Sequence, residues 1–217
     1  MTAAPVFVTG GTGYIGSALV TALLARGYAV HALIRAGSGS KLPPAAVTVT
    51  GDALDPETFA AAIPSGATIV HLIGTPHPDP SKAGEFLRVD LGSIRATAAA
   101  AQRARAAHLV FVSVAHPAPV MRAYIAARVE GESLVRATGI AATIVRPWYV
   151  LGPGHRWPLV LVPLYALLRA FPPTRAGAER LGLVTREQMV ASLLDAIAHP
   201  PHGAVRVVEV PEIRRGP

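Results

Sequence analysis

Short runs of β-branched and other apolar residues alternate with alanine-rich segments along the whole chain. This alternation predicts parallel strands joined by crossover helices, and the apolar continuity of each run suits strands that are covered on both faces. The sequence therefore predicts an α/β protein with a doubly wound parallel sheet. The expected strands are 5–9, 29–34, 46–50, 67–73, 108–113, 141–146 and 204–210, and the expected helices are 14–26, 56–62, 82–105, 119–138, 159–170 and 185–198.

Composition favours one compact domain, residues 1–217. Of the 217 residues, 51% are hydrophobic and only 15% are charged, which suffices for a sizeable core and excludes intrinsic disorder. Cysteine is absent, which excludes a disulfide framework, a thiolate metal site and a cysteine nucleophile. The histidines are not spaced like a metal site, so we expect no metal.

The formal charge of +7 would suit a polyanionic partner, but its distribution argues against nucleic acid. The cations are scattered singly, without a basic run and without interleaved aromatic residues. No basic region followed by a long apolar region opens the chain, so we expect no signal peptide and a cytoplasmic protein. The longest apolar stretch, 157–168, contains two prolines and is shorter than the ~20 residues of a spanning helix, so no transmembrane segment is expected.

A glycine-rich turn joins the first expected strand to the first expected helix. Its glycines follow the spacing G-x-x-G-x-x-G. Glycines in such a turn allow a tight bend, let backbone N–H groups approach a pyrophosphate, and let the helix pack closely on the strand. The position between strand and helix favours dinucleotide binding over an ordinary glycine-rich turn. The expected phosphate-binding residues are Gly10, Thr12, Gly13, Tyr14, Ile15 and Gly16.

The second expected strand ends in Arg35, where an NAD-binding unit would carry an acidic residue for the ribose hydroxyls. The guanidinium of Arg35 could clamp a 2′-phosphate with two hydrogen bonds, and Ser38, Ser40 and Lys41 in the following loop could add contacts. The alternative is that Arg35 is only a solvated charge at a strand end. The pattern favours NADP as the cofactor over NAD.

Further motifs extend along nearly the whole chain. They are Gly51-Asp52-Ala53-Leu54-Asp55, Ile69 to Gly74, Val89-Asp90, Phe111-Val112-Ser113, Tyr124 to Glu132, Arg146 to Gly154 and Leu181 to Met189. With the glycine turn, they make the chain resemble the short-chain dehydrogenase/reductase superfamily. The resemblance is to its extended and atypical branch, which includes NAD-dependent epimerase-like, NmrA-like and complex I accessory-subunit-like NAD(P)-binding proteins. It implies a Rossmann fold and further cofactor contacts from Asp52, Ala53, Leu72, Ile73, Gly74, Ser113, Arg128 and Pro147.

The catalytic motif of this superfamily is Tyr-x-x-x-Lys, and the matching pair in this chain is Tyr124 and Arg128. The resemblance implies that the tyrosine acts as acid or base at a carbonyl or alcohol oxygen, while the lysine binds the nicotinamide ribose. Arginine keeps the positive charge but cannot release a proton. A second departure is Ala115, which stands where the extended branch has a catalytic serine or threonine. Ser113 is then a cofactor-side residue and a candidate catalytic hydroxyl.

The segment after the sixth expected strand is short for the extended branch, so we expect residues 147–203 to contribute a small substrate-side lobe. The expected substrate residues are His116, Trp148, Tyr149 and Trp157. His116 could protonate a substrate oxygen or be only a turn residue before proline. The aromatic residues of this lobe and the apolar expected helix 159–170 favour an apolar or aromatic ligand, or a lipid or quinone tail. The expected helix 159–170 could touch a membrane surface or merely cap the sheet, and the oligomeric state is left open.

Two functions from different classes fit this sequence. The first is an NADP(H)-dependent oxidoreductase or epimerase that acts on a small, apolar carbonyl or alcohol, with Tyr124 as acid or base assisted by Arg128. The second is a dinucleotide-binding sensor, regulator or assembly subunit without turnover, which Arg128, Ala115 and the short lobe favour. Both share every cofactor contact, so only turnover distinguishes them. The absence of a G-x-S-x-G elbow argues against an acyl-transfer hydrolase.

Overall fold

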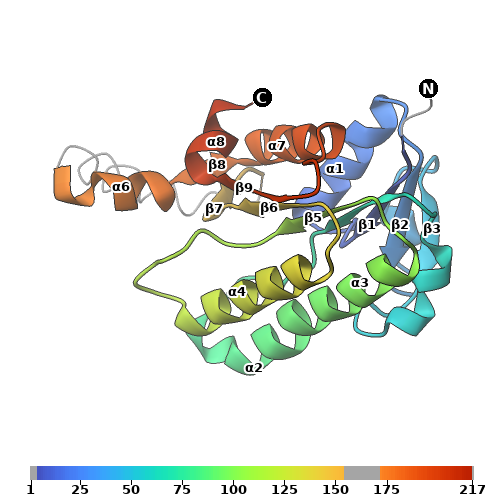
Figure 1. Cartoon of the computed structure of the whole chain (residues 1–217), viewed down its shortest axis with the longest axis horizontal. Helices are drawn as coiled ribbons and strands as arrows, with labels where there is room; N and C mark the ends of the chain where they lie inside the picture. The colour runs from blue at the N-terminus through green and yellow to red at the C-terminus, as the bar shows by residue number, and fades with distance from the viewer. Residues whose placement is uncertain (1–3, 154–171, 217) are drawn as a thin grey trace.

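The strands form one parallel sheet, as Figure 1 shows for the computed structural model, which describes residues 4–153 and 172–216. Seven strands lie in the order β3-β2-β1-β4-β5-β6-β9. Their bounds are β1 Val6–Thr9, β2 Val30–Ile34, β3 Val47–Thr50, β4 Thr68–His71, β5 His108–Val112, β6 Ala142–Arg146 and β9 Val205–Glu209. The order reverses between β1 and β4, so the predicted doubly wound parallel sheet is confirmed.

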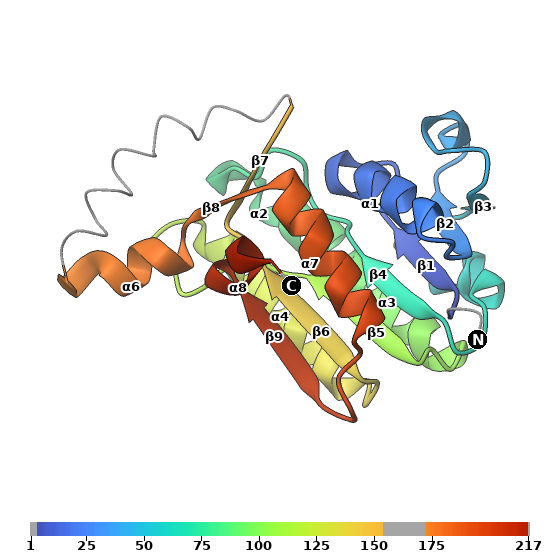
Figure 2. The ribbon, with the colours of Figure 1, turned by 90° about the horizontal axis from the view of Figure 1, so that it is seen from above.

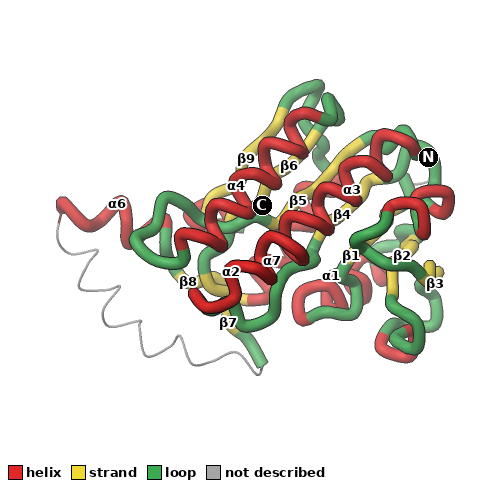
Figure 3. The backbone as a smooth tube through the Cα atoms, turned by 90° about the horizontal axis from the view of Figure 1, so that it is seen from below, coloured by secondary structure: helices red, strands yellow, loops and turns green. Residues whose placement is uncertain are grey.

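Helices cover both faces of this sheet (Figure 1). On one face, α1 (Tyr14–Ala25) packs against α7 (Arg186–Ala198). On the other face, α3 (Gly92–Arg103) and α4 (Arg122–Ala137) lie side by side, as Figure 3 shows from below. The central strands are therefore buried on both sides, which explains why their sequences are almost continuously apolar.

The prediction of one helix at 56–62 is wrong, because the chain makes two short 3₁₀ turns there, η2 (Pro56–Thr58) and η3 (Ala60–Ala62). The Asp55 carboxylate caps the first turn by accepting a hydrogen bond from the N–H of Glu57. Phe59 lies between the turns and is 1% exposed. The backbone of Phe59, with a φ of −142°, leaves the helical region and separates the two turns.

The expected helix 82–105 is helical but not uniform. It opens with the 3₁₀ turn η4 (Pro80–Lys82) and the single turn α2 (Ala83–Glu85), and it passes through the π-helical segment η5 (Phe86–Leu91) before α3. The wider π turn brings Phe86, Asp90 and Leu91 to the buried side. In a helix of 3.6 residues per turn, Phe86 and Asp90 would share a face but Leu91 would lie roughly 140° from Phe86, so the sequence pattern did not show that all three are buried.

The helix expected at 119–138 starts later, at Arg122, because Met121 before it takes a left-handed backbone conformation with φ 59°. The helix expected at 185–198 is confirmed. Thr185 and Gln188 form its capping box, in which each side chain accepts a hydrogen bond from the other residue's backbone N–H.

The sequence missed several elements near the chain's C-terminal end. Two short strands, β7 (Tyr149–Leu151) and β8 (Leu183–Thr185), form a separate parallel pair beyond the main sheet (Figure 2). The helix α6 (Pro172–Arg180) extends away from the sheet, and α8 (Val210–Arg215) directly follows β9. The expected helix 159–170 lies outside the described residues. Within 4–153 and 172–216, none of the helices has both the length and the apolar character needed to cross a bilayer.

Candidate functional site

A cavity of about 730 Å³ opens at the carboxyl ends of β1, β2 and β4, where the strand order reverses. Open α/β sheets bind ligands at such a switch point. Nine of the expected cofactor residues line it, namely Gly10, Thr12, Gly13, Arg35, Asp52, Ala53, Leu72, Ile73 and Gly74. We call this cavity the dinucleotide groove.

The glycine turn forms the floor of the groove. Gly10 has a φ of +77°, and a Cβ on it would lie 3.0 Å from the carbonyl carbon of Leu72. A Cβ on Gly16 would collide with the carbonyl oxygen of Gly10. The N-cap of α1 is Gly13, which provides no side-chain cap, and the first turn of this helix has no acidic residue. The N–H groups that begin α1 are thus left for an anion such as a pyrophosphate.

Two cations lie at the end of the groove that follows β2. Arg35 and Lys41 line it and are exposed, and neither side chain has an ion pair among the described residues. Asp52 lies nearby with its carboxylate fixed by a hydrogen bond of 2.9 Å from the N–H of Leu54. This end of the groove therefore offers unneutralised positive charge.

Arg128 does not line the groove but lies next to the lining residue Gly74, where it is held by the protein itself. Its side chain is 6% exposed, and its Nη2 lies 2.6 Å from Oδ1 of Asp90. Nη1 donates to the carbonyl of Val112 at 3.0 Å, and Nη2 donates to the carbonyl of Ile73 at 3.2 Å. A Cβ on Gly74 would collide with Nη2. The guanidinium thus joins the ends of β4 and β5.

Asp90 is the partner that sequence reasoning did not single out as functional. Its carboxylate is fully buried, and its Oδ2 accepts hydrogen bonds from the hydroxyl of Thr75 at 2.6 Å and from the N–H of Thr75 at 3.1 Å. The π-helical segment η5 places Asp90 on the inner side of its helix. Only the motif Val89-Asp90 in the sequence pointed to this residue.

Tyr124 stands next to this ion pair at the start of α4. Its ring makes an edge contact with Phe86, with centroids 5.1 Å apart, and Cζ of Arg128 lies 5.3 Å from its ring centre. Tyr124 and Arg128 are four residues apart on one helix, so they lie on one face, as the motif predicts. The ring is thus fixed between an apolar and a cationic neighbour.

Ser113 belongs to a second buried polar cluster, centred on Glu132. Its hydroxyl donates to Oε1 of Glu132 at 2.7 Å, and Arg146 reaches the same carboxylate through Nε at 2.8 Å and Nη2 at 2.5 Å. Burial opposes ionisation of Glu132, but the hydrogen bonds from Arg146 and Ser113 outweigh it, so its pKa lies below the usual value. Nε2 of His116 lies 3.5 Å from Oε1 of Glu132.

His71 is a buried strand residue. Its Nδ1 lies 2.9 Å from the hydroxyl of Thr9 and 3.0 Å from that of Thr97. Burial, and then the charge of Arg128, lower its pKa to about 3, so the ring is neutral. In the part of the chain that the structure describes, no group of three or more His, Cys, Asp or Glu residues is placed to hold a metal ion.

Tyr14 turns toward the β7–β8 pair and does not line the groove. Its ring centre lies 5.3 Å from Cζ of Arg186, and a Cβ on Gly152 would collide with its hydroxyl. Ile15 and Gly16 continue α1 behind the turn. Tyr14 therefore connects the glycine turn to the segment that follows β6.

The expected substrate residues lie at the carboxyl ends of β5 and β6. Trp148 and Tyr149 make an edge contact, with centroids 5.5 Å apart, and burial raises the pKa of Tyr149. The carbonyl of Pro147 accepts a hydrogen bond of 2.9 Å from the N–H of Ala115, which joins this segment to the loop that carries His116. Trp157 lies outside the described residues.

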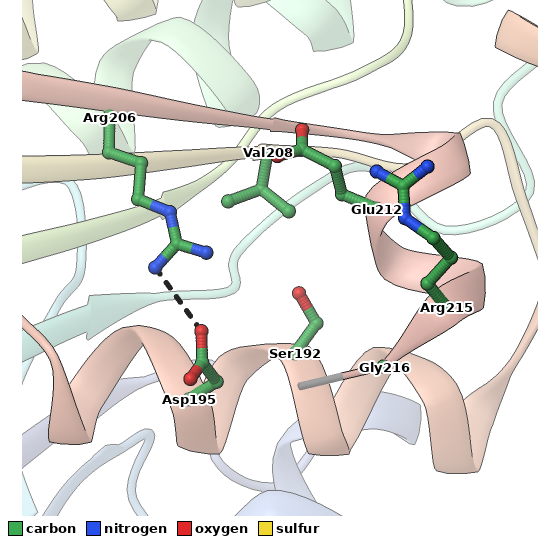
Figure 4. A pocket seen from close by; sticks show the side chains of 7 residues that line it. All are labelled: Ser192, Asp195, Arg206, Val208, Glu212, Arg215 and Gly216. Atoms are coloured by element: carbon green, nitrogen blue, oxygen red, sulfur yellow. Dashed lines mark hydrogen bonds and ion pairs between the residues drawn. The ribbon is translucent and has the colours of Figure 1, made fainter.

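A second hollow, of about 160 Å³, lies between α7, β9 and α8 (Figure 4). Arg206 and Asp195 form an ion pair of 3.2 Å across it. Its lining residues are Ser192, Asp195, Arg206, Val208, Glu212, Arg215 and Gly216. None of the residues expected in a site lies there, so the dinucleotide groove is the candidate functional site.

Comparison with known sequences identifies the family of this chain. The sequence profile of a family described as NAD(P)H-binding matches residues 10–156. The chain is 30% identical over 212 residues to ceramide reductase of Caulobacter vibrioides, covering 97% of this chain and 65% of that protein. It is 29% identical over 168 residues to 4-hydroxy-2-methyl-3-oxo-4-farnesyl-3,4-dihydroquinoline-1-oxide ketoreductase of Stigmatella aurantiaca, covering 67% of this chain and 50% of that protein. The chain thus spans half to two thirds of these relatives.

Solved structures share the fold. MoeE5 in complex with UDP-glucose and NAD superposes with a TM-score of 0.69 at 21% identity, covering 96% of this chain and 79% of that protein. WbmG of Bordetella bronchiseptica in complex with NAD and UDP gives a TM-score of 0.68 at 19% identity, covering 96% and 73%. These likenesses concern the fold alone.

Proposed function

The chain belongs to the NAD(P)H-binding family of the short-chain dehydrogenase/reductase superfamily, and from this premise we propose that it is an NADP(H)-dependent oxidoreductase acting on an apolar carbonyl or alcohol. The observation that carries this proposal is the groove itself, whose floor is the glycine turn. Tyr124 does not line the groove but contacts Phe86, which lies between the lining residues Glu85 and Arg88.

The groove fits a nicotinamide dinucleotide. Because the turn consists largely of glycines, no side chains fill the space above it. The N-terminus of α1, whose first backbone N–H groups have no side-chain cap, faces this space. When bound, the nicotinamide supplies the hydride that converts a carbonyl to an alcohol. The residues that would hold the dinucleotide are Gly10, Thr12, Gly13, Arg35, Asp52, Ala53, Leu72, Ile73 and Gly74.

The preference for NADP rests on Arg35 and Lys41. A 2′-phosphate adds negative charge at the adenosine end, where these two cations have no carboxylate to neutralise them among the described residues. Arg35 can form two hydrogen bonds with one phosphate, and Lys41 adds a point charge. The 2′-hydroxyl of NAD would leave both cations without an anion.

We assign the proton transfer at the substrate oxygen to Tyr124. In the reduction direction, its hydroxyl gives a proton to the carbonyl oxygen that becomes the alcohol. The contacts with Phe86 and Arg128 fix the ring, so the hydroxyl is held in one place.

Arg128 serves mainly to hold Tyr124 and the strand ends in place. Its two terminal nitrogens already bind Asp90 and the carbonyls of Ile73 and Val112. The ribose contact that the superfamily motif implies would require this network to open. We therefore regard Arg128 as a positioning residue first.

The proposed substrate carries a long apolar or aromatic group. Trp148 and Tyr149 are half-buried aromatic side chains after β6 that contact each other, and Trp148 also packs against the core on the α1 side. The names of two relatives, a ceramide reductase and a farnesyl-quinoline ketoreductase, are consistent with this class. A lipid-like ketone or a quinone is the substrate class that we would test first.

Turnover is the direct test of this function. NADPH oxidation would be followed by absorbance with three carbonyl probes, namely 4-nitrobenzaldehyde, 9,10-phenanthrenequinone and 2-tridecanone. We expect the wild type to oxidise NADPH with at least one probe, and Tyr124→Phe to lower the rate by about 100-fold or more without weakening NADPH binding. Tyr28→Phe, at the turn before β2, is the matched control and should keep full activity.

Two outcomes would contradict this function. One is a Tyr124→Phe variant as active as the wild type, because the proton would then come from another group. The other is a wild type that binds NADPH tightly but turns over none of the probes, which would favour a binding module without turnover.

A further inference from the structure

One cation in the dinucleotide groove has no role in the proposed function. Besides Arg35 and Lys41, the side chain of Arg88 lines the groove, and it is exposed. None of the ion pairs among the described residues includes Arg88. Glu85, three residues earlier, also lines the groove, and it takes part in none of these pairs either. Arg88 is therefore a positive charge at the groove that no carboxylate in the described residues neutralises.

The structure fixes the backbone that carries Arg88. This residue lies in the π-helical segment η5, between Phe86 and Asp90, which are 0% and 1% exposed. The ring of Phe86 contacts that of Tyr124, with centroids 5.1 Å apart, and the carboxylate of Asp90 lies 2.6 Å from Arg128. A buried anchor on each side holds the backbone of Arg88. A ligand that binds the guanidinium therefore has to order only the side chain.

Arg88 and the glycine turn reach the groove from opposite faces of the sheet. The turn leads into α1, whose apolar residues pack in the core on one face. The segment η5 lies between α2 and α3, and its Phe86 and Leu91 pack in the core on the other face (Figure 1). Both line the groove at the carboxyl edge of the sheet. A ligand that lies along this edge thus has the glycine turn on one side and Arg88 on the other.

Contacts of the residues after Arg88 place it along the groove. The carboxylate of Asp90 accepts two hydrogen bonds from Thr75, which comes shortly after β4. One turn after Arg88, a Cβ on Gly92 would lie 3.4 Å from Cδ2 of Leu54, which comes shortly after β3. In the order β3-β2-β1-β4, the end of β1 lies between these two points. The wall that carries Arg88 therefore runs past the end of β1, where the glycine turn begins.

The balance of charge indicates which part of a dinucleotide Arg88 would meet. A pyrophosphate carries one negative charge on each phosphate, whereas the N-terminus of a helix offers only about half an elementary positive charge. The glycine turn, residues 10–16, contains no lysine or arginine. Arg35 and Lys41 lie at the end that follows β2, where we propose the 2′-phosphate. Arg88 is the remaining cation among the described lining residues, and a guanidinium can bond two phosphate oxygens at once.

We propose that Arg88 binds the pyrophosphate of the dinucleotide from the wall opposite the glycine turn. This inference rests on the proposed function. NADPH and NADH share the pyrophosphate, whereas only NADPH carries the 2′-phosphate. Arg88 therefore raises the affinity for both dinucleotides equally, and Arg35 distinguishes between them.

Three ligands test this division of roles. NADPH carries both the pyrophosphate and the 2′-phosphate, NADH carries only the pyrophosphate, and adenosine 2′-monophosphate carries only the 2′-phosphate. Calorimetry measures the two dinucleotides, and displacement of fluorescent NADPH measures the mononucleotide. We expect Arg88→Ala to bind NADPH and NADH each about tenfold more weakly and adenosine 2′-monophosphate as tightly as the wild type. Arg35→Ala should weaken NADPH and adenosine 2′-monophosphate and leave NADH unchanged.

Two further variants serve as controls. Arg88→Lys keeps the charge but loses the two-pronged hydrogen bonding, so it should lose less affinity than Arg88→Ala. Arg95→Ala removes an exposed arginine of the following helix, α3, that does not line the groove, and all three affinities should stay at the wild-type value. Urea denaturation should give Arg88→Ala the stability of the wild type, because its side chain is exposed.

Three results would overturn the role of Arg88. Wild-type affinity of Arg88→Ala for both dinucleotides would show that the guanidinium makes no contact. A loss confined to NADPH and adenosine 2′-monophosphate would assign it to the 2′-phosphate, and an equal loss for all three ligands would assign it to the adenosine. A wild type that binds none of the three would instead contradict the proposed function, so the two failures are distinguishable.

Discussion

The two ends of the dinucleotide groove handle charge in opposite ways. At the end that follows β2, proposed above to hold the adenosine, Arg35 and Lys41 are exposed and have no carboxylate partner among the described residues. At the other end, Arg128 and Asp90 are buried and neutralise each other at 2.6 Å. The first arrangement leaves charge available for a ligand, whereas the second stabilises the protein's own architecture. Substitutions at the two ends should therefore change different properties.

The largest effect is expected from breaking the buried ion pair. Asp90→Ala leaves the guanidinium of Arg128 buried without its carboxylate, which should cost about 3–5 kcal/mol of unfolding free energy. Glu130→Ala is the matched control, because it removes an ion pair of 3.3 Å with Arg95 in which both side chains are more than half exposed. The control should cost less than about 1 kcal/mol. Urea denaturation of both variants gives the comparison, and equal losses would contradict it.

The next largest effect is the acid sensitivity of the buried end. His71 has a folded pKa of about 3, below its value in the unfolded chain, so the unfolded state binds a proton that the folded state does not. Stability should therefore fall as the pH drops below about 6.5, by up to about 1.4 kcal/mol per pH unit from this group.

Urea denaturation between pH 5 and 7 measures this slope. His71→Gln should reduce the slope by about one proton, whatever its effect on absolute stability. His202→Gln, an exposed control, should leave the slope unchanged. A His71→Gln variant with the wild-type slope would show that the ring is not held neutral in the folded protein.

The two ends of the groove also differ in how well the sequence alone predicts them. The glycine turn and Arg35 are short-range signals, because the strand, the turn and the helix follow each other directly. Arg35, Gly10, Thr12 and Gly13 line the groove, whereas Tyr14, Ile15 and Gly16 of the same turn do not. The fold was equally predictable, since strands covered on both faces require continuous apolar runs.

The buried end could not be predicted in this way. The spacing of Tyr124 and Arg128 shows that they share a face, but it does not show that Asp90 on another helix occupies the guanidinium. That contact depends on the π-helical segment η5, which has no recognisable sequence period. The Glu132 cluster likewise joins β5, α4, β6 and β9, so only the folded chain brings it together.

The smallest expected effect concerns the exposed end. Arg35→Ala should weaken NADPH binding about tenfold, or about 1.4 kcal/mol, and leave NADH binding unchanged. Arg136→Ala, which removes an exposed arginine of α4, is the matched control and should change neither affinity. The stability of both variants should stay close to that of the wild type. An equal loss for NADPH and NADH would contradict the assignment of Arg35 to the 2′-phosphate.

The most direct test of the central claim, that this groove binds NADP(H), is calorimetric titration of the wild type with NADPH and, separately, with NADH. The account predicts micromolar binding of NADPH and at least tenfold weaker binding of NADH, a gap of about 1.4 kcal/mol or more. Equal affinity for the two would contradict the role of the exposed cations. Binding of neither would contradict the claim itself.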